Sequence, residues 1–320
     1  MRRLMRIAGM ILLLLLTGAG SAYLWRNPET ATLDAEARTG ASGRFVTLSD
    51  GITHYDVSGP DTGRVAVLVH GFSVPYYIWD STAVALGSAG YRVVRYDVFG
   101  RGLSDRPDTA YDGALYDRQL RELLDSLQIR GPIDLMGLSY GGYITSHFTV
   151  GNAQRVRTLT LIDPVTTSPA VPPLLSAPVL GHWFWQMMQA PTAADGQASD
   201  FLHPERWPDW ADRYRPQMRY RGFGRALRRS AIHSSRTDYP GLYTRVGTTG
   251  IPVLLVWGKQ DATVSIATST VVRSGIRNLE YVVVDSSGHL PHMEQASIVH
   301  TRMLDFLQRH PPSVASAPAP

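Results

Sequence analysis

Three residues that could cooperate in nucleophilic catalysis each follow a short apolar run of the sequence: Ser139, Asp261 and His289. A serine hydroxyl attacks a carbonyl carbon effectively only when a base takes its proton. A histidine, whose pKa lies near neutrality, can take that proton and return it to the leaving group, and a carboxylate fixes the histidine tautomer. These residue types therefore predict hydrolysis through an acyl-enzyme on Ser139.

The serine lies in the pentapeptide Gly137-Leu-Ser-Tyr-Gly141, between the apolar run 133–138 and a helical segment over 143–150. Strand, sharp turn and helix are the setting of a nucleophile elbow, in which glycines avoid collisions across the tight bend. The pentapeptide alone is a weak signal, because a turn that merely uses glycines gives the same pattern. Its weight comes from the acid and the histidine at two later strand ends.

A tetrahedral intermediate carries an oxyanion, which needs backbone N–H donors. The N–H of Tyr140, at the start of the predicted helix, is one candidate donor. The N–H of Phe72, in the loop that follows the apolar run 64–69, is the second. We expect His70 to order this loop rather than to act as a catalyst.

Each catalytic assignment has a competing interpretation. Asp261 could serve only as the N-cap of a helix, and Asp163, also at a strand end, is the alternative acid. His292 is the alternative to His289, but its place at the start of a predicted helix suggests that it faces solvent. The remaining histidines show no metal-ligand spacing, so we expect no metal site.

Apolar runs and helical periodicity alternate along most of the chain, after an opening hairpin predicted for 44–48 and 52–57. This alternation predicts an α/β fold with a mostly parallel sheet and helices on both faces. The carboxyl ends of parallel strands lie along one edge, so residues that each follow a strand can meet there. The predicted strands are 64–69, 91–98, 133–138, 156–162, 252–257 and 279–284, and the predicted helices are 78–88, 114–127, 266–274 and 292–309.

The alternation stops between residues 164 and 250, where prolines and tryptophans crowd together. We predict that 164–250 is a cap inserted above the carboxyl ends of the strands, where ligands bind in open α/β sheets. The core is then formed by 44–163 and 251–310. The polar, alanine-rich stretch 27–43 is predicted to be a linker, and the tail 311–320 is predicted to be disordered.

Residues 1–26 are predicted to be a targeting segment, because three arginines precede an apolar run from Ile7 to Trp25. The small residues at 20–22 would permit cleavage by signal peptidase. Alternatively, the run would span roughly 28 Å as a helix, which suffices for an uncleaved membrane anchor. The leading arginines favour an N-terminus in the cytoplasm, so we expect the domain to be exported. It would then be free in the periplasm or outside the cell, or it would be anchored by a single N-terminal transmembrane helix with the domain outside the cytoplasm.

Composition removes several classes of function. The 320 residues include no cysteine, which excludes disulfides, thiolate metal sites and cysteine nucleophiles. The formal net charge of +4 is accounted for by four arginines within 1–26, a segment that contains no acid. The remainder is formally neutral, so the basic balance does not indicate nucleic-acid binding, and no nucleic-acid motif is present. The sequence leaves the oligomeric state open.

Five motifs make the chain resemble the α/β-hydrolase superfamily over about residues 44–309. The resemblance implies an eight-stranded sheet with a helical cap inserted after strand six, Ser139, His289 and Asp261 as a catalytic triad, and no cofactor. The chain looks most similar to the capped serine-hydrolase branch of esterases, monoacylglycerol lipases and C–C hydrolases of ring-cleavage products. The matching stretches are His70-Gly-Phe72, Asp97 to Asp105, Gly137 to Gly142, Trp257 to Asp261, and Ser287 to Glu294.

We expect the substrate to be a small-molecule ester or lipid with an apolar acyl group. The cap segment 174–188 is rich in apolar and aromatic residues. We interpret it as a lid helix packed on the core, as an acyl-binding wall that includes Trp183 and contacts a membrane, or as both. Leu290 is expected to contact substrate because it follows His289, at a position where the C–C hydrolases often carry tryptophan. The alternatives are a C–C bond hydrolase and a non-catalytic binding protein of the same fold.

Overall fold

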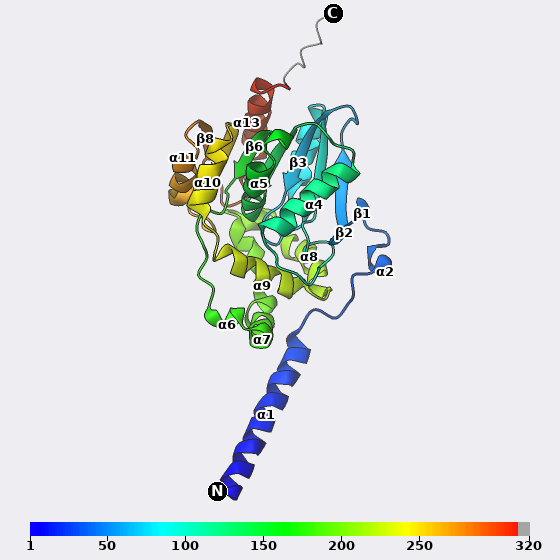
Figure 1. The fold of residues 1–320 in the computed structure, drawn as a ribbon, viewed down its shortest axis with the longest axis vertical. Helices are drawn as coiled ribbons and strands as arrows, with labels where there is room; N and C mark the ends of the chain where they lie inside the picture. The colour runs from blue at the N-terminus through cyan, green and yellow to red at the C-terminus, as the bar shows by residue number, and fades with distance from the viewer. Residues whose placement is uncertain (313–320) are drawn as a thin grey trace, which may run out of the picture.

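The computed structural model describes residues 1–312, which form an eight-stranded sheet with the order β1-β2-β4-β3-β5-β6-β7-β8 (Figure 1). The first two strands form the predicted antiparallel hairpin, β2 pairs antiparallel with β4, and every pairing from β4 to β8 is parallel. The prediction of an eight-stranded, mostly parallel sheet is confirmed. The strands are β1 Arg44–Leu48, β2 Gly51–Ser58, β3 Arg64–Val69, β4 Tyr91–Tyr96, β5 Ile133–Leu138, β6 Val156–Ile162, β7 Val253–Gly258 and β8 Leu279–Val284.

The central strands are buried on both faces, as their continuous apolar runs require. In β3, Val67 and Val69 pack into one apolar cluster, whereas Ala66 and Leu68 pack into the other. Helices α4, α5, α10 and α11 contribute to the first cluster, and α3 and α13 contribute to the second. These helices are α3 Asp80–Ser88, α4 Gly113–Ser126, α5 Tyr140–Gly151, α10 Tyr239–Thr248, α11 Ser269–Gly275 and α13 Ala296–Arg309.

Two predicted helices are divided in the structure. The one predicted for 78–88 starts with a 3₁₀ turn, Tyr76–Trp79, before α3 begins. The closing helix predicted for 292–309 is broken at Gln295, whose φ and ψ of −126° and 47° are not helical. The break separates α12, Pro291–Glu294, from α13, so the residues directly after His289 form a short turn of their own.

Between β6 and β7 the chain forms five α-helices joined by 3₁₀ turns. Four of them lie on the side of the body from which the N-terminal helix projects (Figure 1): α6 Pro173–Ser176, α7 Pro178–Met188, α8 Trp210–Tyr214 and α9 Phe223–Ser234. The fifth, α10, packs against α5 and α11 on the sheet. The cap boundaries 164–250 remain a prediction, but the structure groups α10 with the helices of the core.

The stretch 27–43, predicted as a linker, is fastened to the body instead. The carboxylate of Glu29 is buried and accepts hydrogen bonds from the N–H groups of Gly222 and Gly224, at 2.6 and 2.7 Å. These groups lie at the start of α9, where N–H groups have no partner within the helix. The segment also contains a short helix, α2, Ala35–Arg38. A free tether would make none of these contacts.

The N-terminal helix α1, Arg2–Arg26, projects from the body with no buried residue (Figure 1). An 18-residue window of it has a mean hydropathy of 2.0. By length and composition it could cross a membrane, and a signal sequence would pass the same test. At the other end of the chain, most of the tail predicted to be disordered, from residue 313 onward, lies outside the described residues.

Candidate active site

Ser139 lies on a sharp turn between β5 and α5. Its φ of 52° and ψ of −117° are unfavourable for a residue with a side chain, at a cost of about 1–3 kcal/mol. The turn is held because the Ser139 N–H donates to the carbonyl of Ile162 at 2.9 Å. A Cβ on Gly137 would lie 2.4 Å from the Gly141 carbonyl oxygen, and one on Gly141 would lie 2.3 Å from that of Val69. Both glycines are therefore required by close backbone approach.

Asp261 and His289 meet at the same edge of the sheet. Nδ1 of His289 lies 2.8 Å from Oδ2 of Asp261, and both side chains are buried. Because a carboxylate can only accept, the Nδ1 atom carries the proton and Nε2 is left as the basic nitrogen. The other oxygen, Oδ1 of Asp261, accepts from the N–H groups of Thr263 and Val264, each at 2.8 Å. Asp261 thus fixes both the loop and the imidazole tautomer.

The pKa of His289 reflects two opposing effects. Burial lowers it, but the hydrogen bond from Nδ1 to Asp261 and the negative charge of that carboxylate outweigh burial, so the pKa is raised above its ordinary value. The imidazolium form is therefore stabilised once a proton arrives. A base that must take a proton and then release it needs this property.

Ser139 and His289 line one cavity of about 190 Å³. Among the described residues no hydrogen bond joins their side chains. The cavity is also lined by Leu290, whose contact with substrate stays a prediction. The predicted substrate contact Trp183 lies elsewhere, with its Nε1 donating to the carbonyl of Ala19 at 3.1 Å. The structure therefore corrects the placement of Trp183, which packs against α1. The other lining residues are Gly71, Phe72, Ser73, Val74, Ile78, Leu138, Gln197, Asp200 and Thr263.

Of the two predicted oxyanion donors, Phe72 lines this cavity and Tyr140 follows Ser139 directly in the chain. Tyr140 is the first residue of α5, so its N–H has no partner within the helix. Buried His70 lies with Nδ1 2.9 Å from the Gly71 carbonyl, while its Nε2 accepts from the Val98 N–H at 3.0 Å. Because the N–H and C=O of a trans peptide point in opposite directions, this contact turns the Phe72 N–H away from His70. Burial lowers the pKa of His70 to about 4, so the ring is neutral and orders the loop.

His292, the alternative histidine, was expected to face solvent, and that prediction is wrong. Its side chain is buried, its Nε2 lies 3.1 Å from the carbonyl of Ile78, and its ring packs against Trp79. Burial lowers its pKa to about 3. The short helix α12 faces inward because the break at Gln295 lets it turn toward α3 independently of α13.

The sequence profile of the alpha/beta hydrolase family matches residues 66–300. The chain belongs to the alpha/beta hydrolase family. Among its curated relatives, a 2-hydroxy-6-oxononadienedioate/2-hydroxy-6-oxononatrienedioate hydrolase of Cupriavidus pinatubonensis is 28% identical over 295 residues, which cover 87% of this chain and 99% of the relative. The predicted membership of the superfamily is confirmed.

Two of the solved structures that share the fold of this alpha/beta hydrolase are, by their names, enzymes that act on esters or lipids. A thermophilic esterase from Thermogutta terrifontis superposes with a TM-score of 0.70 at 23% identity, covering 85% of this chain and all of the esterase chain. A membrane phospholipase A, described as a bacterial virulence factor, superposes with a TM-score of 0.66 at 23% identity. That match covers 97% of this chain and 99% of the phospholipase chain.

A second carboxylate, Asp163, lies beside the Asp261–His289 pair of the hydrolase. Ligand atoms of the three side chains all lie within 4.8 Å of one another, and all three residues are buried. Oδ1 of Asp163 accepts from the Gly258 N–H at 2.9 Å, and Oδ2 has no donor among the described residues. Burial, together with the charge of Asp261 and a hydrogen bond with it, raises the pKa of Asp163 well above its ordinary value. A carboxyl that keeps its proton is a poor cation ligand. The cluster therefore favours a proton shared between Asp163 and Asp261 over a bound cation.

The loop that carries His289 is held by Glu294, whose importance the sequence did not reveal. Oε2 of this buried carboxylate accepts from the Gly288 N–H at 2.7 Å, and Oε1 accepts from the Leu202 N–H at 2.8 Å. The His289 N–H itself donates to the carbonyl of Asp200 at 2.8 Å. These contacts join the histidine loop to the insertion between β6 and β7.

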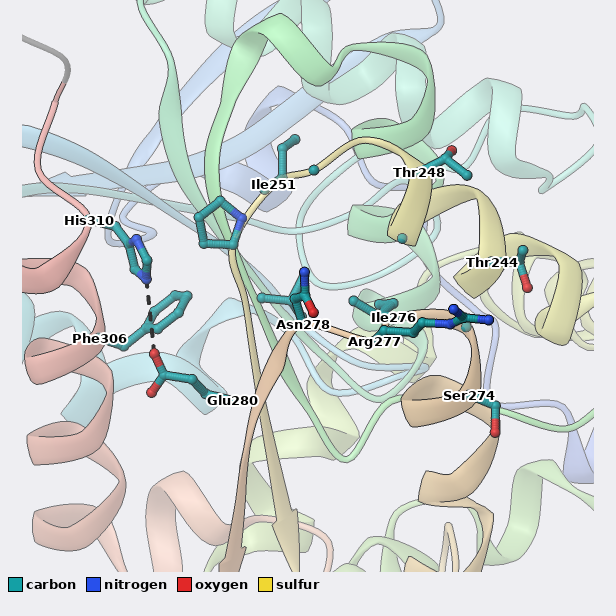
Figure 2. A pocket seen from close by; sticks show the side chains of 15 residues that line it. Thr244, Thr248, Ile251, Ser274, Ile276, Arg277, Asn278, Glu280, Phe306 and His310 are labelled. Carbon is teal, nitrogen blue, oxygen red and sulfur yellow. Dashed lines mark ion pairs between the residues drawn. The ribbon is translucent and has the colours of Figure 1, made fainter.

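A larger cavity, of about 630 Å³, lies at the opposite edge of the sheet (Figure 2). It is lined by residues at the amino ends of β7 and β8, including Val253 and Asn278, and its rim holds the loose ion pair of Glu280 with His310 at 4.0 Å. Its lining includes Ser274, but Figure 2 shows this serine on the other side of the pocket from the Glu280–His310 pair. Ligands of open α/β sheets bind at the carboxyl ends of the strands, where Ser139 lies.

Proposed function

We propose that the protein is a serine hydrolase that cleaves carboxylic esters of apolar acyl groups through an acyl-enzyme on Ser139. One observation carries the proposal: Ser139, held on a strained turn, shares a cavity with His289, whose tautomer is fixed by Asp261. In this mechanism Nε2 of His289 takes the hydroxyl proton as Ser139 attacks the ester carbonyl. The same nitrogen then returns the proton to the departing alcohol.

The N–H groups of Phe72 and Tyr140 stabilise the oxyanion that forms during the attack. Water, activated by His289, then attacks the acyl-enzyme, and the acid is released with Ser139 restored. The cavity is lined in part by the apolar side chains of Val74, Ile78 and Leu290. This lining favours a substrate with an apolar acyl group over one with a charged acyl group. In this mechanism no metal or organic cofactor takes part in the reaction.

The ester assignment is supported by the length of the match to the membrane phospholipase A, which extends over 97% of this chain. We propose accordingly that α1 anchors the hydrolase in a membrane, with its body outside the cytoplasm. The second candidate is hydrolysis of a C–C bond in a vinylogous diketone, which the relative from Cupriavidus pinatubonensis favours by its name and by its 28% identity.

The test is labelling of the full-length protein and its Ser139→Ala variant with a fluorophosphonate probe, beside a panel of nitrophenyl esters from short to long chain. We expect labelling and turnover in the wild type only, with at least about a 10⁴-fold loss of turnover in the variant. Circular dichroism controls for folding of the variant. Labelling without ester turnover would favour the C–C hydrolase, and turnover retained by Ser139→Ala would refute the assignment.

A further inference from the structure

We propose that helices α6 and α7 form a membrane-contact surface, which rests in the interfacial layer of the bilayer that α1 spans. This inference relies on the proposed anchoring by α1 and goes further, because it concerns the exported body of the protein. The surface consists of the exposed apolar side chains Leu174, Val179, Leu180 and Met188. Its partner is a phospholipid bilayer at the level of the boundary between headgroups and acyl chains.

Three polar contacts fix α7 to the C-terminal part of α1. Nε1 of Trp183 donates to the Ala19 carbonyl at 3.1 Å, and Nε2 of His182 lies 3.1 Å from the Tyr23 hydroxyl. At the other end of α7, the Arg26 guanidinium donates to the carbonyl of Met187 at 3.4 Å. Figure 1 shows α6 and α7 at the end of the body from which α1 projects. The depth of α7 relative to the bilayer is therefore set by the position of α1 in the membrane.

The position of Ala19 within α1 gives the depth of α7 below the membrane surface. The stretch between Arg6 and Arg26 carries no charged residue and would span roughly 28 Å, close to the thickness of a hydrocarbon core. Arg26 is expected to stay at the membrane surface, as charged side chains do at helix ends. Ala19 lies seven residues before Arg26, so it is roughly 10 Å deeper along the helix axis. Trp183, bonded to Ala19, is thereby placed below the surface, in the range of roughly 5–10 Å where interfacial helices lie.

The exposed side chains of α6 and α7 suit this location. Val179 is 79% exposed, Leu180 61%, Met188 57% and Leu174 44%. Of the eight large apolar side chains that are exposed in the described body beyond α1, these four fall within fifteen consecutive residues, whereas the others are scattered over the chain. A clustered apolar patch marks an interaction surface, whereas single exposed residues do not. Helix α7 contains no acid, lysine or arginine, so nothing in it opposes contact with lipid.

A bilayer is favoured over a second protein because the patch continues directly from α1, whose apolar side chains are exposed along its length. The same insertion leads from α7 to Gln197 and Asp200, which line the cavity that contains Ser139. A lipid that leaves the bilayer beside α7 would thus meet the insertion that contributes to this cavity. Esters of membrane lipids are accordingly the substrate class of the hydrolase.

The absence of cysteine permits a direct test on the full-length protein. Single cysteines at Val179 and Leu180, labelled with an environment-sensitive fluorophore, are measured in phosphatidylcholine–phosphatidylglycerol vesicles that contain doxyl-labelled lipid. Val84→Cys is the matched control, since Val84 is 69% exposed on α3, and Leu16→Cys reports insertion of α1. We expect blue-shifted emission and at least about twofold stronger quenching at 179 and 180 than at 84. Equal, water-like emission at 179, 180 and 84, or no quenching at 16, would overturn the proposal.

Activity gives a second measurement. We expect Leu180→Asp to lower hydrolysis of vesicle phospholipid about tenfold relative to hydrolysis of a water-soluble short-chain ester, because a charge replaces an apolar contact with lipid. Val84→Asp should leave that ratio unchanged. An unchanged ratio in Leu180→Asp would count against the surface. If the wild type hydrolysed neither substrate, the proposed function would fail, while the quenching measurement would still decide whether α7 touches the membrane.

Discussion

The carboxyl edge of the sheet and the α6–α7 helices differ in what surrounds their side chains. At the sheet edge, three ionisable groups are buried together, and each has partners fixed by the backbone or by another side chain: Asp163, Asp261 and His289. In α6 and α7, large apolar side chains such as Val179 are exposed and have no such partners. Buried charge is stable only where its partners are fixed, whereas exposed apolar surface calls for a partner outside the chain.

The two regions also differ in how they are attached. Ser139 is held by β5, by α5 and by the Ile162 carbonyl, so its position is determined by the sheet itself. The insertion contacts the rest of the chain through side chains, among them the carboxylates of Glu294 on the histidine loop and Glu29 on the segment after α1. Substitutions at the sheet edge should therefore change turnover, and substitutions at the attachments should change stability.

The largest effect after loss of the nucleophile is expected for Asp261→Asn. The Asn Oδ1 can still accept from Thr263 and Val264, so the loop should fold. The amide NH₂ would face His289, which would then carry its proton on Nε2 and could not accept the proton of Ser139. We expect a loss in kcat of about 10⁴ in ester hydrolysis. Thermal unfolding by circular dichroism controls for stability, and a loss below tenfold with normal folding would rule out Asp261 as the orienting acid.

A smaller effect is expected at Asp163, where two substitutions separate proton sharing from packing. Asp163→Asn keeps an acceptor for the Gly258 N–H and a donor for Asp261, so kcat should stay within about threefold. Asp163→Ala removes both and should lower kcat about tenfold, because a buried N–H loses its partner. Steady-state ester hydrolysis measures both. Equal losses in the two variants would show that the carboxyl does not act as a shared-proton donor.

The raised pKa of Asp163 also predicts a pH dependence of stability. Between the unfolded carboxyl pKa, about 4, and the raised pKa of the folded state, the folded protein binds the extra proton. The free energy of unfolding should therefore fall as pH rises through this window. Asp163→Asn lacks this contribution, so its unfolding midpoint should drop less between pH 5 and pH 8. The raised pKa of His289 lowers stability with rising pH in both proteins, so its effect cancels in the comparison. A steeper drop of the unfolding midpoint in the variant than in the wild type would contradict the shared proton.

The sheet edge could be predicted from the sequence because its signals are local. An apolar run followed by Gly137-Leu-Ser-Tyr-Gly141 contains the strand, the glycines and the serine in a few residues, and Asp261 and His289 each follow a strand of the same kind. The burial of His292 was missed because it depends on Trp79, more than 200 residues earlier. The contact of Trp183 with Ala19 was missed for the same reason. Local composition predicts which face of a helix is apolar, but not which distant element covers it.

The smallest effect on turnover is expected at Glu29, where the segment after α1 meets α9. In Glu29→Gln one oxygen becomes an NH₂ group that faces N–H donors, so one of the bonds to Gly222 and Gly224 is lost. The free energy of unfolding should fall by about 1–3 kcal/mol, as for a hydrogen bond to a charged group, while hydrolysis of a soluble ester stays within about twofold. Glu36→Gln, at an exposed site on α2, is the matched control and should change neither. Thermal unfolding in detergent micelles measures the difference. If Glu29→Gln instead abolished ester turnover at full stability, the attachment of the insertion would be part of the active site, and the contrast between the two regions would not hold.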